Sequence, residues 1–350
     1  MYRGARVPRP SIVKIFCILL LPVALAADSA PRIGSIDYYG IRKVPESHIQ
    51  KALGVAVGDA LPASKGDVED RLADVPGVVL ARLEAVCCDG GRSMLFVGIE
   101  EKGAAHFALR SAPQGDVTLP ADLSDPYQDL IAAVERAAQR GSTAEDLTHG
   151  HALAADPDAR AIQQRFLELV PKHLLEIRDV LRNSADTDQR AMAATLIGYA
   201  REKEKVVPDL EYAMQDPDEN VRASAMDALG AIAVLAAKQP DLEIRISPTW
   251  FVEMLNSVVL SDRMKAAKAL VNLTDSRPVA TLDLMRERAL PSLAEMAQWH
   301  SLSYALPPFL LLGRVGGLSD QEIQNRWTQG DREDMVRDVL SGKKKKRSLQ

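Results

Sequence analysis

The sequence predicts an α+β protein in which a small β-α-α-β-β domain precedes a larger all-α domain of paired helices. Two observations lead to this fold class. Short runs of alternating apolar residues separated by turn residues, which are typical of strands, occur between residues 31 and 102. From residue 126 onward the apolar residues instead recur every three or four positions, and one helix-pair pattern repeats. The predicted parts are a leader (1–27), a mixed domain (31–102), a linker (103–125), helical repeats (126–315) and C-terminal helices with a basic tail (316–350).

The composition is that of an ordinary globular protein, because 47% of the 350 residues are hydrophobic and 26% are charged. The formal net charge of −5 provides no overall positive field to attract nucleic acid. Aromatic residues, at 5%, are too few to favour a surface on which bases would stack. We therefore expect no nucleic acid among the partners.

Residues 1–27 have the parts of a secretory signal peptide. Basic residues come first, an apolar core follows at Ile15–Leu21, and Ala24-Leu25-Ala26 forms a small-x-small cleavage signal. The apolar core is too short to span a bilayer comfortably, and Pro22 interrupts it. We expect the leader to be cleaved and the mature protein to be periplasmic or secreted. The alternative is an inner-membrane anchor formed by residues 11–27.

The mixed domain is predicted from five local patterns. A strand-like run ends at Gly40, two helical patterns follow, and Asp89-Gly90-Gly91 is a hairpin turn signal between two further strands. These elements are a first strand through Ile33, Ile36 and Tyr38, helices at Glu46–Leu53 and Lys65–Leu72, a second strand from Pro76-Gly77-Val78 through Val86, and a third strand with Leu95, Val97 and Ile99.

The spacing of these elements resembles a POTRA (polypeptide-transport-associated) domain. The matching pieces are Gly40 with Val44, Gly58-Asp59-x-Leu61, Pro76-Gly77-Val78 and the hairpin that ends at Glu100-Glu101. The resemblance implies an exported domain that binds polypeptides, sometimes by adding a strand to a sheet edge. The candidate partner-binding edge is the second strand, at Val79, Ala81, Leu83 and Val86.

The helical part begins with an amphipathic helix at Tyr127–Ala138, a polar loop-like stretch at Gly141–Pro157 and a helical tract at Ala159–Leu181. The most regular stretch follows at Val206–Ala236, where two amphipathic helices flank an acidic turn. In that turn Asp216 is expected to cap the second helix, with Pro217 at its first position and Glu219 completing a capping box.

Copies of this helix pair lie 32 residues upstream and 41 residues downstream, and a weaker copy covers about Leu290 to Leu312. The pattern D-P-x-x-x-V-R-x-x-A-x-x-A-L-G, here Asp216 to Gly230, resembles a HEAT repeat. The resemblance implies an α-solenoid whose extended surface binds another chain. Arg190 and Arg222 occupy the position that braces neighbouring turns in such repeats, and Asp186 and Asp218 are their candidate acidic partners. Pro307-Pro308 is expected to interrupt the second helix of the last copy.

Three smaller features have more than one interpretation. His149 and His151 could be part of a metal site, but no third ligand is evident and we expect no metal. Cys87 and Cys88 are candidates for a disulfide at the hairpin, or an apolar pair on a strand. The Lys343–Arg347 run is expected to be a solvated tail, with weak contact to an anionic surface as the alternative.

The sequence contains no G-x-S-x-G, P-loop, Rossmann or H-E-x-x-H motif, so no catalytic, cofactor-binding or metal residue is predicted and no cofactor is expected. The leading hypothesis is a non-enzymatic exported scaffold that binds other polypeptides in the cell envelope. The alternative is a solenoid enzyme or enzyme partner resembling HEAT-like chromophore lyases, with the His149–His151 segment as the place to examine. The partner and the oligomeric state stay open.

Overall fold

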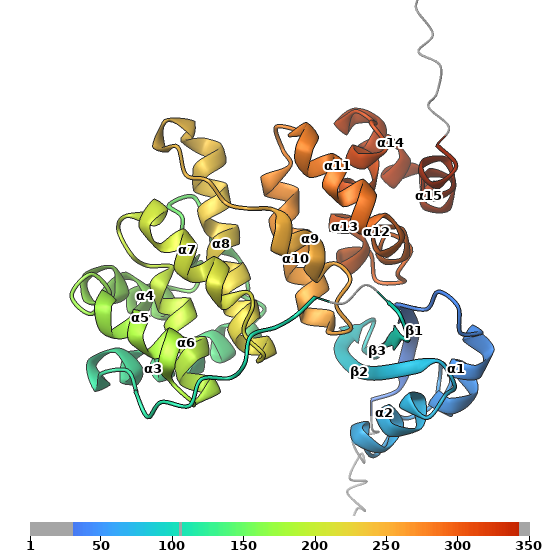
Figure 1. Ribbon diagram of the computed structural model, residues 1–350, viewed down its shortest axis with the longest axis horizontal. Coiled ribbons are helices and arrows are strands. Elements are labelled where there is room, and N and C mark those ends of the chain that lie inside the picture. The colour runs from blue at the N-terminus through green and yellow to red at the C-terminus, as the bar shows by residue number, and fades with distance from the viewer. Residues whose placement is uncertain (1–30, 105–106, 343–350) are drawn as a thin grey trace, which may run out of the picture.

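A computed structural model describes residues 31–104 and 107–342, so the predicted leader and the basic tail lie outside the described residues. Within these ranges the chain forms a mixed domain followed by a helical repeat domain, which confirms the predicted fold class. Figure 1 shows the mixed domain beside the C-terminal half of the helical domain, although it comes first in the chain.

The mixed domain has the predicted β-α-α-β-β order. β1 pairs in parallel with β3, and β2 pairs with β3 in antiparallel fashion, so β1 and β2 are the two edges of the sheet. The side chains of α1 and α2 that face the sheet form a core with one of its faces, through residues such as Leu53, Leu72 and Leu95. The elements are β1 (Ile33–Tyr39), α1 (Glu46–Leu53), α2 (Lys65–Ala73), β2 (Val78–Asp89) and β3 (Arg92–Glu101).

The helical domain is a stack of helix pairs preceded by a helical cap. We name the pairs repeat 1 (α5–α6), repeat 2 (α7–α8), repeat 3 (α9–α10) and repeat 4 (α12–α13). Their second helices stack in sequence, because α6 packs on α8, α8 on α10 and α10 on α13. The cap and repeats comprise α3 (Ala121–Gln139), β4 (Glu145–Asp146), β5 (Leu153–Ala154), α4 (Pro157–Leu169), α5 (Leu174–Asn183), α6 (Thr187–Ile197), α7 (Lys203–Ala213), α8 (Glu219–Lys238), the 3₁₀ turn η1 (Pro240–Leu242), α9 (Thr249–Met254), α10 (Leu260–Leu273), α11 (Val279–Arg288), α12 (Leu290–Met296), α13 (Leu302–Val315), α14 (Asp320–Gln329) and α15 (Arg332–Leu340).

Small residues allow these helices to approach closely. A Cβ atom added at Gly198 would lie 3.0 Å from the Cβ of Ala228 on the next repeat. Among the described helices α8 alone is long and apolar enough to cross a membrane, and 50% of its apolar window is buried inside the protein. Its place between α6 and α10 makes it a core helix of the stack.

The predicted caps are partly corrected. α8 begins at Glu219, and Asp218 is its cap, accepting the backbone N–H groups of Asn220 and Val221. Asp216 lies two residues before the cap and pairs with an arginine of the preceding repeat. The capping box predicted at Ser319 with Glu322 is confirmed at the start of α14. The prolines predicted to interrupt the last repeat instead lie inside the continuous helix α13.

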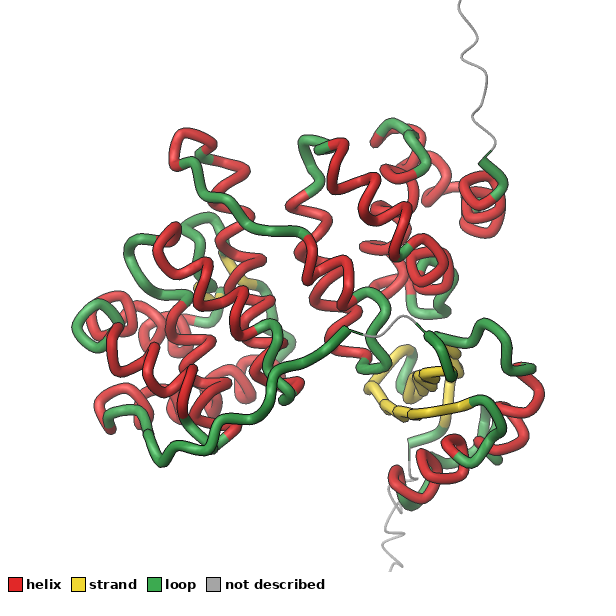
Figure 2. The backbone as a smooth tube through the Cα atoms, in the orientation of Figure 1, coloured by secondary structure: helices red, strands yellow, loops and turns green. Residues whose placement is uncertain are grey.

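The linker lies along the turns of the first two repeats as an extended strap (residues 107–120). Figure 2 shows this loop running from the sheet to the far end of the helical domain. The N–H of Gly115 donates to the carbonyl of Asn183 at 2.8 Å, and the guanidinium of Arg110 lies 3.3 Å from the ring centre of Tyr212. The strap ends earlier than predicted, because α3 already begins at Ala121 and includes the buried Pro126.

The second face of the sheet packs against repeats 3 and 4. Phe96 stacks on Tyr304 with ring centres 5.3 Å apart and meets the edge of Trp299 at 5.1 Å. Tyr39 donates its hydroxyl hydrogen to the carbonyl of Val258 at 2.9 Å. Gly98 permits this approach, since a Cβ atom there would lie 2.6 Å from the same carbonyl. The sheet is therefore sandwiched between its own two helices and the end of the solenoid.

Candidate binding cleft between the two domains

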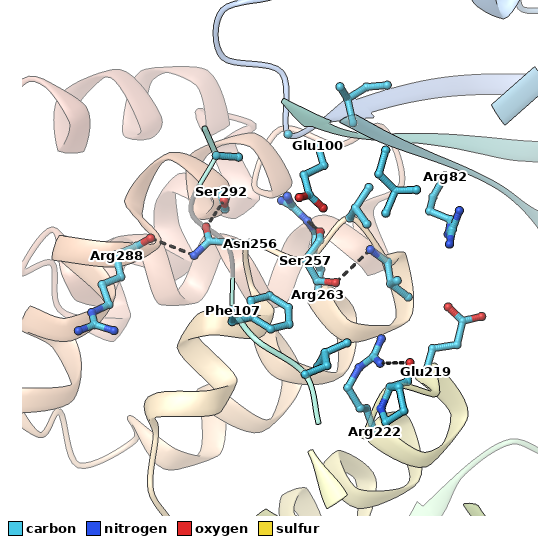
Figure 3. A pocket seen from close by; sticks show the side chains of 18 of the residues that line it. Arg82, Glu100, Phe107, Glu219, Arg222, Asn256, Ser257, Arg263, Arg288 and Ser292 are labelled. Atoms are coloured by element: carbon cyan, nitrogen blue, oxygen red, sulfur yellow. Dashed lines mark hydrogen bonds between the residues drawn. The ribbon is translucent and has the colours of Figure 1, made fainter. Parts of the chain in front are cut away.

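An open cleft of about 590 Å³ separates the sheet from the turns of repeats 2, 3 and 4. Figure 3 shows the strands above the cleft and the turns of the repeats below it. We call this space the interdomain cleft. The sheet side is lined by Gly40, Arg42, Leu80, Arg82, Ile99 and Glu100, the strap by Phe107 and Leu109, and the turns by Pro217–Asn220, Arg222, Asn256–Val259, Arg263, Arg288, Pro291 and Ser292.

The residues of the sheet that line the cleft are determined by the two-residue period of a strand. On β2 the side chains of Ala81 and Leu83 point into the core formed with α1 and α2, where they are 1% and 3% exposed. Leu80 and Arg82 therefore lie on the opposite face, which lines the cleft. In Figure 3 Arg82 reaches down from the strand at the side where Glu219 rises from the turn of repeat 2.

The strand edge expected to bind a partner is present, but its side chains are placed differently from the expectation. Of the four residues, Val79 is exposed at 58%, Ala81 and Leu83 are buried, and Val86 is half-buried against the helical domain. The edge therefore presents its backbone N–H and C=O groups and the Val79 side chain to a partner. The backbone edge is also partly covered, because the N–H of Leu83 donates to the carboxylate of Glu69 on α2 at 2.8 Å.

One carboxylate next to the cleft contacts residues of both domains. Glu295 of α12 accepts from the backbone N–H of Gly40 at 3.1 Å and from the Arg42 guanidinium, and Arg263 of α10 approaches it at 3.5 Å. Burial lowers the pKa of the Arg263 guanidinium, while the Glu295 charge opposes that shift. Arginine nevertheless stays protonated in proteins, so two cations share one anion here.

Glu101 fixes the loop that carries Arg42 into the cleft. Its carboxylate accepts from the backbone N–H groups of Arg42, Lys43 and Val44 at 2.7–2.9 Å. Burial opposes ionisation of Glu101, but the three hydrogen bonds outweigh it and the pKa of this carboxyl is lowered. The carboxylate is thus held charged, and the loop after β1 is held in one conformation.

An arginine ladder joins the turns of neighbouring repeats, as the sequence predicted, but with other partners. Arg190 donates two hydrogen bonds of 2.9 Å to Asp216 of repeat 2, and Arg222 donates at 2.8–3.2 Å to Asp262 of repeat 3. The predicted partners, Asp186 and Asp218, instead cap α6 and α8. Sequence reasoning missed Arg263, which continues the ladder. The 41-residue offset that aligns repeat 3 with repeat 2 could have found it, because 222 and 263 differ by 41.

The two predicted histidines lie at the other end of the solenoid, away from the interdomain cleft. His149 is exposed, whereas His151 is buried and borders a second groove of about 330 Å³ between α3 and the second helices of repeats 1 to 3. Burial, together with the charge of Lys203 at 3.4 Å, lowers the pKa of His151 to about 4. In residues 31–104 and 107–342 no three acidic, histidine or cysteine side chains lie close enough to hold a metal ion.

Cys87 is disulfide-bonded. The side chain of Cys88 lies outside the described part of the structure, so pairing between these two cysteines stays a prediction.

Comparisons with known proteins bear on the helical domain. Residues 174–247 match the family model of HEAT repeats. A designed armadillo repeat protein has a similar structure, with 13% sequence identity and a TM-score of 0.35 over 54% of this chain and 95% of that chain. No curated protein matches the sequence. The stacked helix pairs described above make the helical part a solenoid that follows a mixed β/α domain, and residues 174–247 of this solenoid match HEAT repeats.

Proposed function

We propose that this protein is a non-enzymatic scaffold of the cell envelope that binds extended segments of other polypeptides in the interdomain cleft. The observation that carries the proposal is the position of β2, an edge strand whose Leu80 and Arg82 line the cleft. A sheet edge offers backbone groups to an incoming strand, and a solenoid offers a long surface beside it. One bound segment could therefore contact both domains.

The β-α-α-β-β order supports the proposal that the mixed domain is POTRA-like and binds by strand addition. Two features support an envelope location. The sequence of residues 1–27 has the parts of a signal peptide, and Cys87 is disulfide-bonded, which fits an oxidising compartment.

Site-specific crosslinking in cells tests this function. Val79 is replaced by p-benzoylphenylalanine, which is expected to capture polypeptides of the envelope because this side chain is exposed on the edge strand. The control is the same replacement at Leu175, which is 77% exposed on α5 and does not line the cleft. Equal capture at both positions, or crosslinks at 79 that do not map to extended segments, would contradict strand binding at this edge.

A second candidate function, a solenoid that holds a prosthetic group, is favoured by the groove at His151. That groove combines apolar residues such as Leu130 and Met226 with the buried imidazole. A chromophore that copurifies with the protein and is lost on changing His151→Phe would support it, whereas clean absorbance and metal analyses would count against it.

A further inference from the structure

The turn of repeat 3 lacks a carboxylate that the turns of repeats 1 and 2 possess. Asp186 and Asp218 each accept two backbone N–H groups from the helix that follows. The same position before α10 is occupied by Val259, which offers no side-chain acceptor. The first backbone N–H groups of α10 therefore have no side-chain acceptor at the cap position, and the carboxylate in its first turn, Asp262, is already engaged by Arg222 and by the Ser257 hydroxyl.

The arginine of repeat 3 is also less well paired than its counterparts. Arg190 and Arg222 each make two or more short hydrogen bonds to an aspartate of the next repeat. Arg263 is 1% exposed, yet its one carboxylate contact is the 3.5 Å approach to Glu295, which Arg42 shares. Its Nη2 atom makes no hydrogen bond to any part of the chain that the structure describes, and its guanidinium lies 4.6 Å from the ring centre of Tyr39.

The missing cap of α10 and the weakly paired Arg263 both border the interdomain cleft. Val259 and Arg263 line the interdomain cleft together with Arg42. Five arginines line this space, and the Glu295 carboxylate that Arg42 and Arg263 share is not among the lining residues. A buried guanidinium with a free donor, next to an uncapped helix of 14 residues, is an arrangement that a ligand carboxylate would complete.

We propose that the interdomain cleft recognises an acidic side chain, glutamate or aspartate, on the polypeptide segment that it binds. Its carboxylate accepts hydrogen bonds from Arg263 and from the first backbone N–H groups of α10. The inference rests on the proposed function, because the segment is the one that adds to β2. We choose a side chain over a chain terminus because a strand beside β2 would run past the cleft, with alternate side chains facing it as Leu80 and Arg82 do.

The test uses the purified full chain and two peptides of eight residues. The peptides alternate threonine and valine, are acetylated and amidated, and differ only in a central Glu or Gln. We expect the Glu peptide to bind at least about tenfold more tightly in fluorescence anisotropy, as a charge-assisted hydrogen bond would produce. Val259→Asp places in repeat 3 the carboxylate found in the other repeats, so it should reduce the preference below about twofold while the cap raises Tm.

Val279→Asp is the matched control, because it adds the same charge to the first turn of α11 outside the cleft lining. It should leave the tenfold preference unchanged. Equal binding of both peptides would overturn the acid recognition and leave the cleft function standing, whereas binding of neither would remove both. A preference that survives Val259→Asp, or that needs a free peptide C-terminus, would also overturn the inference.

Discussion

At the scale of single residues, the solenoid depends on buried ion pairs between repeats. Arg190 and Asp216 are both fully buried, and the arginine also donates to the carbonyls of Ser184 and Ala185 in its own turn. One side chain thus satisfies carbonyls left free at the end of α5 and fixes the position of the next repeat. Removing one partner of such a pair leaves an uncompensated buried charge.

Asp216→Asn should therefore cost about 3–5 kcal/mol in the free energy of unfolding, measured by urea denaturation at pH 7. Asp188→Asn is the control, because Asp188 is an exposed residue in the first turn of α6 and its change should cost less than about 1 kcal/mol. A loss at Asp216 no larger than the loss at Asp188 would show that the ladder adds nothing to stability.

At the scale of elements, β2 is an edge strand that α2 partly protects. The Glu69 carboxylate accepts the N–H of Leu83, a position where an incoming strand would otherwise pair. Lys65 and Arg82 each lie 4.0 Å from the same carboxylate. A charged side chain across an open edge is a common protection against unwanted strand pairing.

Glu69→Ala should uncover this N–H and tighten binding of the Glu-containing octapeptide about fivefold, because one hydrogen bond is worth about 1 kcal/mol. Asp70→Ala serves as the control, since it removes a neighbouring exposed carboxylate of the same helix. If the two variants bind alike in fluorescence anisotropy, Glu69 does not compete with the incoming strand.

At the scale of the whole molecule, the two domains are joined because the central strand β3 is buried on both faces of the sheet. Phe96 and Leu95 are adjacent on β3, and both are 0% exposed. Phe96 faces Trp299 and Tyr304 of the helical domain, whereas Leu95 belongs to the core of the mixed domain. Because neighbouring side chains of a strand face opposite sides, a change at Phe96 affects docking of the domains, whereas a change at Leu95 affects folding of the mixed domain.

Phe96→Ala should undock the mixed domain, because it removes the ring that joins the two cores at a cost of about 3–5 kcal/mol. Calorimetry should then show two unfolding transitions and X-ray scattering a larger radius of gyration. Leu95→Ala should destabilise the first domain without enlarging the folded molecule. A single transition and an unchanged radius in Phe96→Ala would contradict this account of docking.

The predictability of these features follows the range of the interactions behind them. The β-α-α-β-β order, the helix pairs and the Ser319 cap were predictable, because period and turn residues are local signals. The ladder partners and the true cap of α8 were not, since Asp216 and Asp218 are both plausible caps until the neighbouring repeat is placed. Docking of the sheet had only a partial local signal: the continuous apolar run Met94–Val97 is typical of a strand buried on both faces, but it does not indicate which surface covers the second face.

The interdomain cleft also could not be predicted from local sequence patterns. It combines residues that are far apart in the chain, as the contact between Gly40 and Glu295 across 255 positions shows. The polar stretch predicted as a loop before α4 also contains the short β4–β5 pair and a buried histidine. Neither burial nor a distant partner can be read from a short window of sequence.

Docking of the mixed domain on repeats 3 and 4 has a consequence for biosynthesis. The mixed domain is translated first, but its docking surface on repeats 3 and 4 is translated about 200 residues later, and Asp37 must wait for His300, 263 positions away. Closure of such distant contacts is slow and comes late in assembly. A chain that ends before Trp299 would contain the mixed domain but not the surface on which it docks, and the interdomain cleft would not form.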